Sequence, residues 1–188
     1  MTPNPNAKEN ANNRQNEGKQ NLNVERKSLA DLVKERNLSL LHVIMASFMG
    51  QLADLGLLNQ GSANLIGLGV GQRLGRYFKE VGIPLPEKDV EAVKRILELA
   101  DVAEFLLVEK LSDESLLVGI KSDKCKYCPK GVGGAEISGT ICPIPYLIVS
   151  TLTSYTGKKY SVALWKKGKG SIVIKKERGY CKFMIQKT

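Results

Sequence analysis

Four cysteines in the last third of the chain constrain its fold more than any other feature. They are Cys125, Cys128, Cys142 and Cys181. The first two form a Cys-x-x-Cys turn, which directs both sulfurs toward one centre and suits tetrahedral zinc with thiolate ligands. Thirteen residues (129–141) lead from this turn to Cys142, and thirty-eight more (143–180) lead to Cys181. A four-thiolate zinc site would therefore bring a turn and two remote segments together.

Inert buried thiols, two disulfides and redox exchange are the alternatives to a metal site. The first residues are rich in Asn and lack the apolar core of a signal peptide, so we expect a cytoplasmic chain whose thiols stay reduced. A thioredoxin-like motif would follow a strand near the start of a βαβ unit, whereas this one follows a paired-strand pattern. The residues therefore favour structural zinc and leave the other three roles open.

The charge of the chain is concentrated near its carboxyl terminus. The formal net charge is +9, and residues 151–188 hold ten basic side chains and one acidic one. Such a segment suits a nucleic acid or an anionic lipid surface. It also suits the solvated edge of a sheet, where lysines discourage aggregation. Both interpretations remain open.

The first part of the chain differs in composition from the rest. Residues 1–26 are rich in Asn, Gln and Lys and have almost nothing apolar to bury, which predicts a disordered polar tail. Residues 27–188 are long enough for one domain with a proper core. No apolar stretch approaches the length needed to span a bilayer.

Hydrophobic periodicity predicts helices before residue 102 and mainly strands after it. Apolar residues recur at helical spacing in four segments, which begin at Ser28, Ser39, Ser62 and Glu87. The later pattern predicts five strands, at 104–110, 115–120, 160–166, 171–176 and 180–186, and one helix at 142–155. This order predicts an α+β fold, in which an N-terminal helical layer packs on a four-stranded antiparallel sheet and one helix is inserted between two strand pairs.

Two helices carry further information. The apolar stripe on the helix after Ser39 is wider than one intramolecular face requires, which predicts a homodimer through the N-terminal helices. Gly67, Gly71 and Gly75 fall on one face of the next helix. Small residues there allow another backbone or a bound ligand to approach closely.

Catalytic chemistry finds little support in the sequence. The single histidine, His42, lies far from the cysteines and has no marked nucleophile beside it. Glu136, close to the cysteine segment, is the one acidic residue that we expect to assist the metal ligands by a hydrogen bond. We therefore lean against an enzyme.

Three stretches resemble the 4-vinyl reductase domain family, whose members are also called hydrocarbon-binding proteins. They begin at Cys125 (Cys-Lys-Tyr-Cys-Pro-Lys-Gly), at Gly139 (Gly-Thr-Ile-Cys-Pro-Ile-Pro-Tyr-Leu) and at Gly179 (Gly-Tyr-Cys-Lys-Phe-Met-Ile). The resemblance covers residues 28–187 and is greatest to the stand-alone archaeal members. It implies a fold like that of the TRAPP vesicle-tethering subunits, dimerisation through helices, an apolar ligand pocket and, as in phenol-sensing relatives, a nearby zinc site.

The resemblance also implies roles for particular residues. Cys142 and Cys181 match two zinc ligands of the sensors, whose central Glu and Cys would fall near Gly170 and Val173 and are missing here. We infer that Cys125 and Cys128 replace them. Tyr146 matches a position that faces the sensor pocket, and Gly71 lies on the helix expected beside it.

Together these observations predict a zinc-containing protein that binds or senses a small apolar molecule. The zinc would be structural, because four thiolates leave no open coordination position. The alternative is a basic nucleic-acid-binding protein that uses the lysine-rich C-terminal hairpin.

Overall fold

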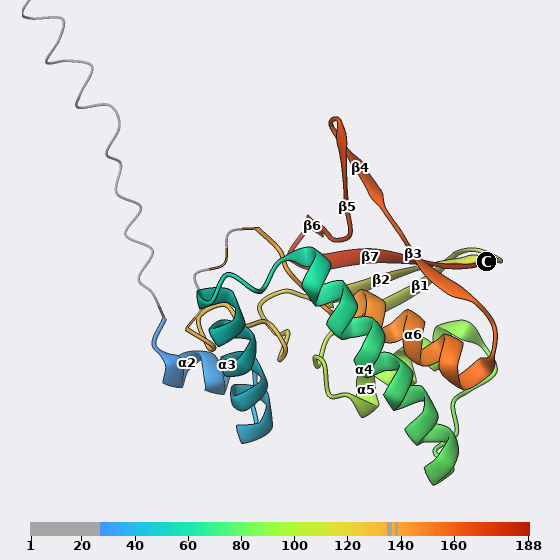
Figure 1. Cartoon of the computed structure of the whole chain (residues 1–188), viewed down its shortest axis with the longest axis horizontal. Coiled ribbons are helices and arrows are strands. Elements are labelled where there is room, and N and C mark those ends of the chain that lie inside the picture. Colours follow the sequence, from blue (N-terminus) through green and yellow to red (C-terminus); the bar gives the residue numbers. More distant parts are fainter. Residues whose placement is uncertain (1–26, 135–136, 138) are drawn as a thin grey trace, which may run out of the picture.

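The computed structural model describes residues 27–134, 137 and 139–188 (Figure 1). The predicted tail of residues 1–26 and Glu136 lie outside this range. The fold class is confirmed: helices occupy the first half of the described chain, and antiparallel strands dominate the second half.

Local capping sets the ends of the helices. The helices are α2 (Leu29–Glu35), α3 (Leu40–Asp54), α4 (Gln60–Val81), α5 (Asp89–Leu99) and α6 (Ile144–Thr156). Ser28 and Ser39 are the N-caps of α2 and α3, as predicted. The third helix begins earlier than predicted, because the Asn59 side chain accepts a hydrogen bond from the Ser62 N–H and takes the cap position. Gly82 ends that helix in the left-handed conformation.

The main sheet contains five antiparallel strands, one more than predicted. They are β1 (Leu106–Ser112), β2 (Ser115–Lys121), β3 (Tyr160–Ala163), β6 (Lys175–Glu177) and β7 (Tyr180–Lys187). The strand order is β1-β2-β7-β3, and the additional strand is β6, which joins the sheet beside β3 by pairing with β7. Both β3 and β6 lie along the same edge of β7, one opposite residues 184–187 and the other opposite residues 180–182.

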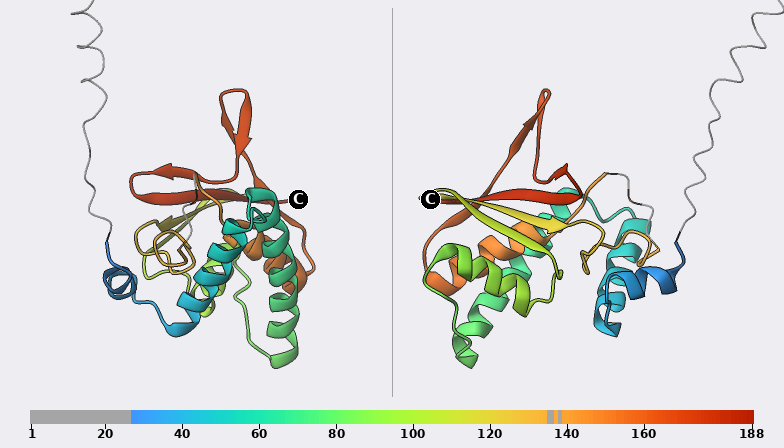
Figure 2. Two further views of the ribbon diagram at one scale, coloured as in Figure 1. Left: turned by 60° about the vertical axis from the view of Figure 1, so that its left-hand side comes forward. Right: turned by 180° about the vertical axis from the view of Figure 1, so that it is seen from behind.

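A two-stranded ribbon leaves the sheet between β3 and β6. It consists of β4 (Trp165–Lys167) and β5 (Gly170–Ile172), which pair only with each other. Figure 2 shows this ribbon projecting from the face of the sheet opposite the helices. The predicted second hairpin, 160–166 with 171–176, is therefore divided: its outer parts join β7, and its tip stands apart.

The main core lies between the sheet and helices α4, α5 and α6. Its buried side chains come from all these elements; among the largest that are fully buried are Ile96, Leu97, Ile120, Ile148, Leu152, Phe183 and Ile185. Helices α2 and α3 lie at one side of this body, next to the segment that follows β2 (Figures 1 and 2). No helix in the described part of the chain is both long and apolar enough to cross a membrane.

Helices α4 and α6 approach each other closely along the predicted glycine face. A Cβ atom added at Gly71 would lie 2.3 Å from the Leu147 carbonyl oxygen, and one at Gly67 would lie 2.4 Å from the Pro143 carbonyl oxygen. Ser150 donates a hydrogen bond to the Leu68 carbonyl oxygen across the same contact. The glycine face therefore serves helix packing, one of the two roles that its spacing allows.

Gly71→Ala is predicted to destabilise the protein by about 1–3 kcal/mol, because the added methyl group forces α4 and α6 apart. Gly69→Ala is the matched control on the same helix, since a Cβ atom there has nothing within 4 Å. The control should be neutral or should stabilise the helix by up to about 1 kcal/mol. Urea unfolding of both variants measures the difference, and equal effects would contradict this account of the helix contact.

Candidate metal centre and its surroundings

All four cysteines line one small cavity at the end of the sheet near α2 and α3. The cavity has a volume of about 60 Å³. Apart from the cysteines, its walls are largely apolar and include Ile120, Ile137, Ile141, Ile174 and Phe183. Lys130 and Lys176 also line it. The structure thus brings together the three remote segments that the cysteine spacing predicted would meet.

The four cysteines come from three structural settings. Cys125 and Cys128 lie in the segment after β2, which we call the cysteine loop (residues 122–134). Cys142 comes two residues before α6, and Cys181 is the second residue of β7, where it is paired with Ile120 of β2. Strand register fixes Cys181, whereas hydrogen bonds from other parts of the chain hold the loop.

The thiols converge without forming a ready coordination shell. All four are free cysteines. Within residues 27–134, 137 and 139–188, no three His, Cys, Asp or Glu side chains stand in a metal-binding arrangement. Binding of an ion would therefore require the thiols to deprotonate and turn toward one another across the cavity.

Burial makes isolated thiolates unfavourable here. It raises the pKa of Cys125 to about 12, with a further rise from the neighbouring Cys128. Burial also raises the pKa of Cys142 and of Cys181. Lys176 and Lys130 act in the opposite direction on Cys181. A buried thiol with a raised pKa, such as Cys125, is a poor nucleophile.

Helices α2 and α3 clamp the cysteine loop from outside. The buried Arg36 guanidinium, at the end of α2, donates hydrogen bonds to the carbonyl oxygens of Cys128 (3.0 Å) and Lys130 (3.2 Å). Helix α3 touches the loop backbone directly, because a Cβ atom at Gly50 would lie 1.8 Å from the Gly133 carbonyl oxygen. No pattern in the sequence indicated this clamp, since Arg36 follows a short helix in which no residue is buried.

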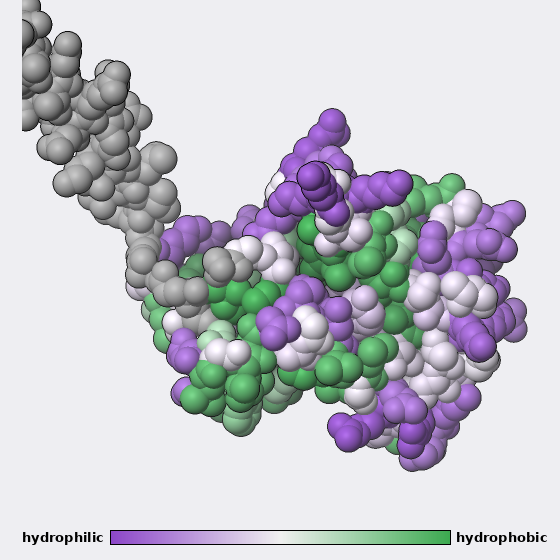
Figure 3. Space-filling model, turned by 45° about the horizontal axis from the view of Figure 1, so that its top comes forward, coloured by the Kyte–Doolittle hydropathy of each residue, from purple (hydrophilic) through white to green (hydrophobic). Residues whose placement is uncertain are grey.

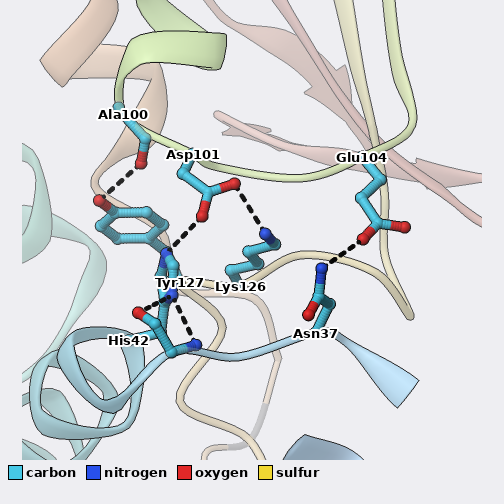
Figure 4. Close-up of polar contacts among 8 residues, drawn as sticks. Asn37, His42, Ala100, Asp101, Glu104, Lys126 and Tyr127 are labelled. Atoms are coloured by element: carbon cyan, nitrogen blue, oxygen red, sulfur yellow. Dashed lines mark hydrogen bonds and ion pairs between the residues drawn. The ribbon is translucent and has the colours of Figure 1, made fainter. Parts of the chain in front are cut away.

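The turn between α5 and β1 holds the loop from the other side (Figure 4). Lys126 forms a 2.7 Å ion pair with Asp101 and donates its backbone N–H to the Val102 carbonyl oxygen. The Tyr127 hydroxyl donates to the Ala100 carbonyl oxygen at 2.8 Å. These bonds fix the two residues between Cys125 and Cys128 and hold the Cys-x-x-Cys turn against the cavity.

His42 joins α3 to this network (Figure 4). Its Nδ1 accepts a hydrogen bond from the Ser39 N–H, and its Nε2 lies 3.5 Å from a carboxylate oxygen of Asp101. Its ring also meets the Tyr127 ring edge-on, with the centroids 5.7 Å apart. His42 therefore has a packing role, and it lies against the cysteine loop although it is far from the cysteines along the sequence.

Ser39, His42 and Asp101 form a serine–histidine–carboxylate chain that was not visible in the sequence. The Ser39 hydroxyl lies 2.7 Å from His42 Nδ1. A general base needs a free lone pair, but this nitrogen already accepts the N–H that begins α3. The arrangement caps the helix and does not activate the serine.

The two residues predicted to contact a ligand lie elsewhere. Gly71 is in the α4–α6 contact, and Tyr146 packs on the core from α6, with its Cβ 3.1 Å from where a Gly67 Cβ would stand. Neither residue lines the cysteine cavity. Their ligand-binding role stays a prediction.

The fold and this site define an α+β domain with a cysteine-lined cavity. Residues 56–187 match the MJ0207 family, and the chain belongs to that family. The matched region contains all four cysteines and begins after α3.

Two relatives come from Methanocaldococcus jannaschii. The uncharacterized protein MJ1342 is 40% identical over 116 residues, which cover 62% of this chain and 95% of that protein. The uncharacterized protein MJ0207 is 30% identical over 94 residues, which cover 50% of this chain and 58% of that protein. Neither printed name gives an activity, and the resemblance to the 4-vinyl reductase family stays a prediction.

Arg36→Met is predicted to loosen the cysteine loop, because it removes both charged donors to the loop backbone. We expect a loss of about 2–3 kcal/mol in stability and faster hydrogen exchange at the amides of Lys126 and Gly133. Arg95→Met, on the exposed face of α5, should change neither quantity appreciably. Unchanged exchange at both amides in Arg36→Met would contradict the clamp.

Proposed function

We propose that this protein is a zinc-containing binding protein rather than an enzyme. The observation that carries the proposal is the convergence of Cys125, Cys128, Cys142 and Cys181 on one cavity. Four thiolates are a common ligand set for structural zinc. With all four positions filled by protein, the ion has no site at which to activate water or a substrate.

The surroundings of the cavity suit such an ion. A four-thiolate zinc centre carries a charge of about −2, and the basic side chains of Lys130 and Lys176 help to line the same cavity. The apolar walls exclude water and strengthen the attraction between ion and thiolates. Zinc would join the cysteine loop, the start of α6 and β7, three parts of the fold that are otherwise held by separate contacts.

The size of the cavity bears on the predicted apolar ligand. Sites for drug-sized molecules have volumes of about 300–1,000 Å³. The cysteine cavity, at about 60 Å³, suits an ion and a few atoms at most. A small apolar molecule would therefore need either a widened cavity or a different pocket, and its binding remains the less supported half of this proposal.

The purified protein is predicted to contain one zinc ion per chain, as measured by elemental mass spectrometry. Cys181→Ser should lose most of the zinc, whereas Tyr180→Phe, the neighbouring change on β7, should retain it. Zinc removal from the wild-type protein by a chelator should lower its melting temperature, which provides a test even if the serine variant does not fold. If removal of zinc left the melting temperature of the wild-type protein unchanged, the proposal would be wrong.

We also propose that the protein forms a homodimer through α3 and α4. Both helices expose large apolar side chains: Leu40, Leu41, Ile44, Met45 and Phe48 on α3, with Leu55 directly after it, and Leu65, Ile66, Leu68, Val70, Tyr77 and Val81 on α4. Figure 3 shows such residues gathered at the α3 end of the molecule. Monomeric soluble proteins rarely expose apolar surface on this scale, and a second copy of the same apolar face would cover it.

Light scattering after size exclusion should give twice the chain mass of 20.6 kDa. Phe48 is 65% exposed on α3. Phe48→Glu should therefore yield monomers, because a carboxylate in an apolar contact between subunits is costly to desolvate. Leu164→Glu, at an exposed leucine away from these helices, should remain dimeric. A monomeric wild-type protein at about 100 μM would refute self-association through these helices at the affinity typical of stable dimers.

A further inference from the structure

The projecting β4–β5 ribbon borders a second, larger hollow in the surface. This groove has a volume of about 440 Å³ and lies between the ribbon and the β6 edge of the sheet. Four of its eight lining residues are lysines: Lys166, Lys167, Lys175 and Lys176. The others are Thr140, Trp165, Ile172 and Ile174. A groove that combines several cations with one large aromatic ring matches the chemistry of phosphate groups and bases.

The lysines are available to different degrees. Glu177 accepts hydrogen bonds from Lys175 and Lys182, which lower its pKa to about 2. Among the described residues, Lys166, Lys167 and Lys176 have no carboxylate within ion-pair distance. Lys169, at the exposed turn of the ribbon, adds a further positive charge beside the groove. Ion pairs with carboxylates of the protein therefore neutralise only part of the positive charge of the groove.

Trp165 is the aromatic component. It is the only tryptophan in the chain, and the Lys175 ammonium lies 5.4 Å from its ring centroid. Its indole N–H is buried and has no hydrogen-bond acceptor among the described residues. Stacking of a base on an aromatic ring is tolerant of sequence and contributes about 1–3 kcal/mol.

Packing does not account for the ribbon. Residues 166–171 are exposed, and β4 and β5 pair only with each other. An isolated pair of strands is marginally stable in water. The ribbon projects away from the body of the molecule (Figures 1 and 2), and Figure 3 shows hydrophilic residues covering it. A projecting basic ribbon therefore serves contact with another molecule better than it serves the core.

We propose that this groove binds single-stranded nucleic acid, with the lysines on phosphates and Trp165 beneath a base. A single strand offers both groups at once, because its bases are unpaired and free to stack. An anionic membrane offers the charge without the base, and duplex DNA keeps its bases stacked inside. The cysteine cavity shares Thr140, Ile174 and Lys176 with the groove, so the wall between the two sites is common.

The single tryptophan allows a direct test. Titration of the full-length protein with an unlabelled 12-nucleotide poly-U strand should quench its fluorescence. Log affinity should fall against log salt with a slope of about −3, the value for four neutralised phosphates on a single strand. The same strand in duplex form, free UMP and vesicles of phosphatidylserine and phosphatidylcholine should each bind at least tenfold more weakly.

Two variants separate the groove from bulk charge. Lys166→Ala with Lys167→Ala should weaken binding by about tenfold or more and bring the slope to about −1.4. The control removes the same charge from α5, by Lys94→Ala with Arg95→Ala, and should change affinity by less than about threefold. Both proteins should retain wild-type circular dichroism and zinc content.

Equal losses in the two double variants would overturn the proposal, as would tighter binding of duplex, UMP or vesicles than of the single strand. Absence of any quenching at about 50 mM salt would overturn it as well. The zinc content of the same samples is an independent reading: single-strand binding by a zinc-free wild-type protein would remove the metal proposal and leave this one intact.

Discussion

The hydrogen bonds that hold the cysteine loop are the interactions on which the site depends. The loop contains no long helix or strand, so its backbone must find partners elsewhere in the chain. Arg36 supplies two of these from α2, and the α5–β1 turn supplies others through Lys126 and Tyr127. The loop thus connects helices α2 and α3 to the body of the domain and at the same time carries two of the four thiols. An ion bound by these thiols would add a bond between the loop and the main sheet.

Much of the fold followed from local pattern. Ser28 and Ser39 marked the helix starts that the structure shows, and the change of hydrophobic period near residue 102 marked the passage from helices to strands. The glycine spacing on α4 predicted a close approach, which α6 makes. The identity of that partner was not readable, because periodicity describes one face of a helix and not what lies against it.

Other features depended on tertiary contacts that no local pattern encodes. The sequence of the second hairpin predicts two continuous strands. In the structure, Val173 and Ile174 are buried, and they separate β6, which pairs with β7, from the projecting ribbon. The cysteine spacing predicted a meeting of three segments, which the shared cavity shows, but the Arg36 clamp was missed because its partners are backbone carbonyls about ninety positions away. The sequence showed that the excess of lysines lies near the carboxyl terminus. Only the three-dimensional structure shows that several of them surround one groove together with Trp165.

The proposal for the metal centre depends on which atoms coordinate one zinc ion. X-ray absorption at the zinc K-edge of the purified protein measures that environment without a mutation. Four sulfur neighbours at about 2.3 Å, with no nitrogen or oxygen in the shell, is the result that the account predicts. A shell with fewer than four sulfurs, completed by histidine nitrogen, carboxylate oxygen or water, would contradict the proposal that all four cysteines bind the ion.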